Sequence, residues 1–148
     1  MTSNQKSFKI IGISIRTNNH KAANDLGKLW SKFISENTTK KIPNKVSEDI
    51  YSIYTDYESD HTGDYTNIIG YRVDNLDNIA SGLIGKEIPS SDYQKFAAKG
   101  RFPDCVQHKW GEIWNTEIDR KYAADFEVYG DKSMNMTDSE VDIFISVK

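Results

Sequence analysis

Residues 124–130 of the chain read ADFEVYG, and this stretch decides how the rest of the sequence is interpreted. Its aromatic and β-branched residues favour a β-strand. Strand alternation places Glu127 on the same face as Tyr129, with Phe126 on the other. Glu127 is therefore either a rim charge in contact with water or a carboxylate held in an apolar site.

A second copy of this strand lies earlier in the chain. The segment YSIY at 51–54 aligns with FEVY at 126–129, and two further segments repeat in the same order. They are GKLW at 27–30 with GEIW at 111–114, and Ile69, Tyr71 and Val73 with Ile143, Ile145 and Val147. Three ordered matches predict a duplicated module, with pseudo-repeats over about 7–75 and 88–148.

Hydrophobic periodicity gives both modules the order strand, helix, strand, strand. The first is expected to contain a strand at 7–17, a helix at 21–37, a loop at 38–49 and strands at 50–57 and 67–73. The second is expected to contain a strand at 90–100, a helix at 102–119 and strands at 123–129 and 141–148. One such module cannot cover its own sheet face or its open edges. We therefore expect a single α+β domain over 1–148, with an antiparallel sheet, two main helices and a central cleft, where small molecules usually bind.

Composition excludes several classes of function. The formal net charge of −3 lacks the basic footprint of a nucleic-acid binder, so no direct nucleic-acid contact is expected. The N-terminal residues lack the apolar region of a signal peptide, and no apolar run approaches a membrane span. A single cysteine, Cys105, suits a reducing cytoplasm, which is the expected location. His20, His61 and His108 are isolated, so neither a metal site nor a cofactor is expected.

A carboxylate with aromatic neighbours has a specific chemical use. Desolvating it without a partner is expensive, so it either takes a proton or attracts a cation. Aromatic faces attract the same cation by about 0.5–2 kcal/mol for each well-placed ring. The combination selects amphipathic cations, which offer an apolar body to the rings and a positive centre to the acid.

Several segments together resemble the GyrI-like effector-binding domains, which also form the ligand-sensing half of AraC-type and MerR-type regulators. The similarity is closest to stand-alone, integron-associated members. It rests on IIGISIRTNN, IYSIYTDYESD, IIGYRVDN, ADFEVYG and VDIFISVK, and it extends from Phe8 to Lys148. The resemblance implies a cleft between the modules with an acid at its base. It assigns that acid to Glu127, through the aromatic–Glu–x–Tyr pattern of 126–129. Regulators of these types carry a helix-turn-helix, for which this chain has no residues left over.

The expected lining of the cleft is Glu127 with Tyr54, Tyr71, Trp110 and Phe144, aromatic residues on or near the elements that border it. Trp110 is favoured because its repeat partner is the smaller Leu26. Trp30 and Trp114, at equivalent positions of the two helices, are expected to pack in the core, and the alternative is that they line the cleft.

Three functions stay open at this point. The first is a stand-alone receptor or sequestering protein for amphipathic, cationic small molecules, with no catalytic residue. The second, also suggested by the resemblance, is a hydrolase that opens strained cyclopropane rings in genotoxic natural products. In that enzyme Glu127 would act as general base, helped by Tyr54 or Tyr71. The third is action through protein contact, for which the sequence offers no interface signature.

Overall fold

The structure, a computed structural model, describes residues 2–60, 62–135 and 137–148. These residues form eight strands, two α-helices and two short 3₁₀ helices. The strands are β1 Thr2–Gln5, β2 Phe8–Thr17, β3 Lys45–Thr55, β4 Tyr65–Val73, β5 Ile84–Ile88, β6 Ser91–Gly100, β7 Ala124–Tyr129 and β8 Ser139–Val147. The helices are α1 Ala22–Ser35 and α2 Asp104–Trp114, and the 3₁₀ helices are η1 Thr38–Lys41 and η2 Asp131–Ser133.

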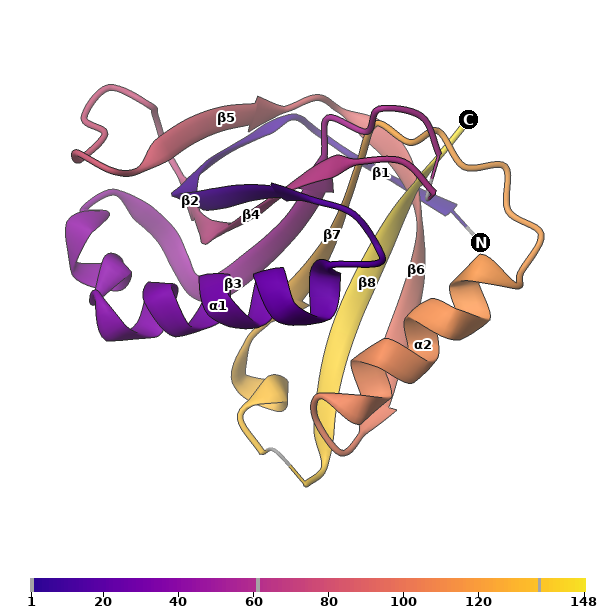
Figure 1. Cartoon of the computed structure of the whole chain (residues 1–148). Coiled ribbons are helices and arrows are strands. Elements are labelled where there is room, and N and C mark those ends of the chain that lie inside the picture. The colour runs from indigo at the N-terminus through magenta and orange to yellow at the C-terminus, as the bar shows by residue number, and fades with distance from the viewer. Residues whose placement is uncertain (1, 61, 136) are drawn as a thin grey trace.

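All eight strands join in one antiparallel sheet, in the order β1-β6-β8-β7-β3-β4-β2-β5. The order β2-β4-β3 on one side is matched by β6-β8-β7 on the other, so the modules meet where β3 pairs with β7. Each module contributes one helix after its first strand (Figure 1). The sheet is thus two strand–helix–strand–strand units related by an approximate twofold axis.

The edge strands are exchanged between the modules. β1 precedes β2 in the chain but pairs with β6, and β5 precedes β6 but pairs with β2. Only two residues separate each edge strand from the strand that follows it. The outer ends of the sheet must therefore lie close together, which curls the sheet into a half-barrel.

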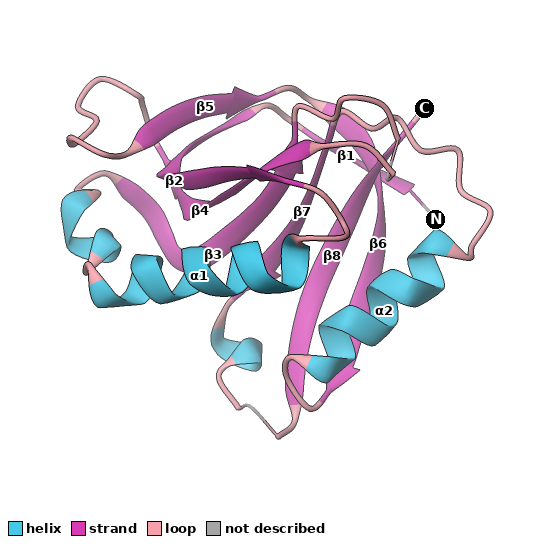
Figure 2. Cartoon of the chain, in the orientation of Figure 1, coloured by secondary structure: helices cyan, strands magenta, loops and turns pink. Residues whose placement is uncertain are grey.

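Both helices lie on the same face of the sheet (Figure 2). The apolar side of α1 buries Leu29 and Phe33 against β2 and β4, and α2 buries Val106 and Ile113 against β6 and β8. Burial of apolar side chains of this size contributes about 1.5–3 kcal/mol each. The opposite face has an aromatic core of its own, made of Phe8, Tyr51, Tyr93, Phe126 and Phe144.

The predicted α+β class, the antiparallel sheet and the two helices are confirmed. The boundaries differ most in two places. β3 begins at Lys45, inside the predicted loop, and α2 ends at Trp114 rather than at residue 119. The sequence reading also missed β1 and β5, whose partners are far away in the chain.

Candidate functional site: a buried carboxylate between two modules

The approximate twofold axis passes through a pair of opposed residues at the centre of the sheet. Ser52 of β3 lies opposite Glu127 of β7. Two residues further along each strand stand Tyr54 and Tyr129, which the repeat alignment makes equivalent. The carboxylate is therefore on the axis, with one tyrosine from each module beside it.

Glu127 is only 2% exposed and accepts hydrogen bonds from three aromatic side chains. The Tyr129 hydroxyl donates to Oε1 at 2.6 Å. The Tyr54 hydroxyl and the Trp110 indole N–H donate to Oε2 at 2.9 and 2.6 Å. Two strands and helix α2 thus hold the carboxylate, and all three donors are uncharged.

No positive side chain compensates the charge of this acid. In the part of the chain that the structure describes, no lysine, arginine or histidine forms an ion pair with Glu127. Burial raises the pKa of Glu127 above its ordinary value, although the hydrogen bonds from Tyr129, Trp110 and Tyr54 oppose the shift. Burial and the nearby negative charge of Glu127 also raise the pKa values of Tyr54 and Tyr129 well above their ordinary value. Both tyrosines are therefore neutral donors.

A second buried acid on the same strand has the opposite environment. Asp125 is fully buried and forms an ion pair with Arg120 at 2.7 Å, the arginine side chain being 7% exposed. The backbone N–H and the hydroxyl of Ser146 donate to Oδ1 of Asp125, and the Tyr57 hydroxyl donates to Oδ2. Asp125 thus has its own cation and ties β7 to β8, whereas Glu127, two residues away, has none.

Aromatic rings from both modules surround Glu127 on the helix side of the sheet. Tyr129 packs edge-on against Trp30 of α1 at 5.1 Å, and Tyr54 packs against Trp110 of α2 at 5.3 Å. Tyr65 continues the cluster, 5.5 Å from Tyr54. Tyr129 and Tyr54 thus each pack against the helix of the other module. Tyr54 and Trp110 are only partly buried, so these two side chains separate the carboxylate from solvent.

Two of the four aromatic residues predicted for the site do lie at Glu127, and two do not. Tyr54 and Trp110 both hydrogen-bond the carboxylate. Tyr71 lies on the same sheet face, but under α1, where its ring packs against Phe33 at 5.7 Å. Phe144 points to the opposite face and stacks on Phe126 at 4.8 Å. Nothing in the geometry connects Tyr71 or Phe144 with the acid.

The sequence reading left three neighbours of the carboxylate out of the site. Tyr129 follows Glu127 by two residues, and the alternation that put both on one face was enough to include it. Trp30 was assigned to the core, yet it is only partly buried and borders the core clusters under both helices. Its repeat partner Trp114 is not a core residue either, at 45% exposed. The position of Tyr65 next to Tyr54 depends on the register of β3 on β4, which local sequence patterns do not give.

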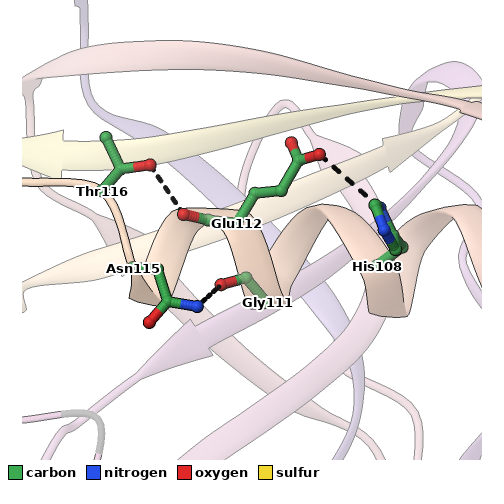
Figure 3. Close-up of a pocket in the computed structure, with 5 residues that line it drawn as sticks. All are labelled: His108, Gly111, Glu112, Asn115 and Thr116. Atoms are coloured by element: carbon green, nitrogen blue, oxygen red, sulfur yellow. Dashed lines mark hydrogen bonds and ion pairs between the residues drawn. The ribbon is translucent and has the colours of Figure 1, made fainter.

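Two surface hollows lie along α2, away from the predicted central cleft. One of about 600 Å³ is lined by His108, Gly111, Glu112, Asn115 and Thr116 (Figure 3). All five belong to α2 or directly follow it, and the Glu112 carboxylate lies 3.6 Å from the His108 ring nitrogen. The hollow has no converging elements, so Glu127 remains the better candidate.

Within the described residues, histidine, cysteine and carboxylate side chains form no group of three that could hold a metal ion. His61 lies outside these residues. Neither helix is long and apolar enough for a membrane span, again among the residues described.

Comparison with known proteins identifies the family. Residues 3–147 match the family model described as "Integron-associated effector binding protein". The chain belongs to this family. The resemblance to GyrI-like effector-binding domains seen in the sequence is thereby confirmed.

A curated relative and two solved structures are similar to nearly the whole chain. An integron cassette protein from the mobile metagenome of Vibrio cholerae is 29% identical, with a TM-score of 0.80 over 100% of this chain and 95% of that one. SAV2435, solved bound to tetraphenylphosphonium, is 23% identical, with a TM-score of 0.84 over 100% and 93%. YobU of Bacillus subtilis strain 168, named as a candidate transcriptional regulator, is 23% identical over 95% of this chain and 92% of its own. At this identity SAV2435 shows a shared fold only.

Proposed function

We propose that this effector-binding protein is a single-domain, cytoplasmic receptor for amphipathic cations, and that Glu127 recognises the positive centre. The observation that carries the proposal is a carboxylate that is 2% exposed, has three neutral donors and forms no ion pair within the described chain. A buried charge of this kind is unfavourable until it meets a cation. The tetraphenylphosphonium bound by SAV2435, which has the same fold, supports this choice of ligand class.

The aromatic residues supply the rest of the recognition. In this proposal Tyr54, Trp110, Tyr129 and Trp30 contact the apolar body of the ligand. Their ring faces add cation–π attraction of about 0.5–2 kcal/mol each. Because Tyr54 and Trp110 cover the carboxylate and are partly exposed, rotation of these two side chains would admit the ligand. An aromatic site without a set of directed hydrogen bonds tolerates ligands of different shapes.

The same arrangement gives no support to the hydrolase alternative. The oxygens of Glu127 already accept three hydrogen bonds, and both tyrosines beside it donate to it. Tyr71, one of the two tyrosines considered as a helper, packs against Phe33 instead. The relatives described above carry names of effector-binding and regulator proteins.

A pair of ligands matched in shape tests the function. Methyltriphenylphosphonium and triphenylphosphine oxide share three phenyl rings, but only the first is charged. We expect the wild-type protein to bind the cation at least about tenfold more tightly, because only the cation compensates Glu127. Quenching of tryptophan fluorescence, confirmed by titration calorimetry, measures both affinities. Equal affinities, or no saturable binding of either compound, would refute the proposed function.

A further inference from the structure

A second acid lies along the aromatic cluster that begins at Glu127. Asp25, in the first turn of α1, is partly buried, and its Oδ2 accepts a hydrogen bond from the Thr17 hydroxyl at 2.8 Å. No ion pair of Asp25 occurs in residues 2–60, 62–135 and 137–148. Like Glu127, Asp25 is held by a neutral donor and lacks a cation.

Tyr65 connects the two acids. It lies directly opposite Thr17 in the β2–β4 ladder, and its ring is 5.5 Å from the ring of Tyr54, which donates to Glu127. The side chains therefore follow one another from Glu127 through Tyr54, Tyr65 and Thr17 to Asp25. Burial raises the pKa of Tyr65 to about 12, and the charges of Glu127 and Asp25 add to this shift.

The Tyr65 hydroxyl is an unused polar group in a nearly buried residue. Tyr65 is only 3% exposed, and no hydrogen bond joins its hydroxyl to the part of the chain that the structure describes. Among the described residues, the Tyr65 oxygen is not one of the fully buried side-chain atoms that lack a partner, so it reaches the surface of the site, where water or a ligand can supply one. A polar group held in this way between two acids indicates a place for a ligand rather than a packed core.

We infer that the site extends from Glu127 past Tyr65 to Asp25, and that its preferred ligands carry two positive centres joined by an apolar spacer. This inference rests on the proposed function, because the first positive centre is the one that Glu127 binds. The second centre lies at Asp25, and the spacer lies against the rings of Tyr54 and Tyr65. The Tyr65 hydroxyl is then free to interact with the second head group or its water.

The sheet geometry sets the scale of such a ligand. Glu127 of β7 lies opposite Ser52 of β3, and Ser52 in turn lies opposite Ile69 of β4. Tyr65 is four residues from Ile69 along β4, so it is two strands and four residues away from Glu127. With strands about 4.8 Å apart and a rise of about 3.3 Å per residue, their backbones are about 16 Å apart. Side chains that converge shorten this span, so a spacer of intermediate length is expected to fit best.

Ligands that differ in one charge test the inference. Each carries a triphenylphosphonium head and an alkyl spacer, which ends in trimethylammonium in one series and in the isosteric, neutral tert-butyl group in the other. In wild-type protein the second charge is expected to improve affinity about three- to tenfold at the best spacer length. In Asp25→Asn, which keeps an oxygen for the Thr17 hydroxyl, the improvement should disappear.

Asp104→Asn is the matched control, since Asp104 is an exposed acid in the first turn of the other helix. It should leave the improvement unchanged. An improvement that survives in Asp25→Asn, or that is absent from wild-type protein at every spacer length, would overturn the inference. If the tert-butyl series binds with a dependence on Glu127 while the second charge brings nothing, only the second subsite is wrong. If neither series binds, both the second subsite and the proposed function are wrong.

Discussion

Replacing Glu127 by glutamine is expected to weaken binding of methyltriphenylphosphonium about 10- to 100-fold, while the affinity for triphenylphosphine oxide changes less than about threefold. The change removes the negative charge at nearly constant shape, so only the charged ligand loses its partner. The glutamine side chain would also keep the local hydrogen bonds. Its oxygen can accept from Tyr54 and Trp110, and its amide can donate to the Tyr129 hydroxyl, which can rotate to accept.

The stability of this variant separates a loss of recognition from a loss of folding. A carboxyl group whose pKa is raised in the folded protein holds its proton more tightly there than in the unfolded chain. Its contribution to stability is therefore full below the ordinary carboxyl pKa and is lost as pH rises through the raised value. Above the raised pKa the wild-type protein buries an ionised carboxylate and Glu127→Gln does not, so the variant should unfold there at the same temperature or higher. Glu112→Gln, on the exposed side of α2, is the control and should alter neither affinity nor stability.

Losing the cation of the neighbouring acid should instead affect folding. Arg120→Met leaves Asp125 charged and buried, with only the Tyr57 and Ser146 donors. Breaking a buried ion pair by removing one partner typically lowers the free energy of unfolding by about 3–5 kcal/mol, and we expect a loss of that size. Urea denaturation followed by circular dichroism measures it.

Two further variants control this experiment. Lys86→Met breaks a more exposed ion pair, Lys86 with Asp56 at 3.0 Å, and should lower the free energy of unfolding by no more than about 1 kcal/mol. Combining Arg120→Met with Asp125→Asn should restore part of the loss, because position 125 then carries no buried charge that lacks its counter-ion. An Arg120→Met protein as stable as wild type would mean that Asp125 does not need its arginine.

The duplicated architecture could be predicted because both modules repeat the same local patterns. Helical spacing in 21–37 and in 102–119, and the alternation in 126–129, each depend on neighbours in the chain. The edge strands could not be found in this way. β1 has the polar sequence Thr-Ser-Asn-Gln, and it is a strand only because β6, nearly 90 residues later, offers an unpaired edge. Strand pairing between segments so far apart in the chain cannot be predicted from local composition.

The surroundings of Glu127 could be predicted where strand alternation and the repeat were sufficient, but not where register was needed. The contact of Tyr54 with Glu127 agrees with the aligned strands. Phe144 was expected in the cleft, but its face depends on how β8 pairs with β7, where it lies opposite Phe126 rather than Glu127. Tyr71 is on the helix side of the sheet, but α1 covers it. The contact of Trp110 with the carboxylate agrees with the preference drawn from its smaller repeat partner.

The central claim is that the ionised carboxylate of Glu127 recognises the cation, and proton release on binding tests it most directly. Below the raised pKa of Glu127 the ligand must displace a proton, whereas above that pKa the acid is already ionised. Titration calorimetry with methyltriphenylphosphonium, in two buffers of different ionisation enthalpy, counts the protons from about pH 5 to about pH 7. We expect wild-type protein to release up to one proton per cation at the acidic end and fewer protons as the pH rises through the pKa of Glu127, and Glu127→Gln to release none throughout. Equal proton release from both proteins, or a wild-type affinity that does not change with pH, would contradict the account.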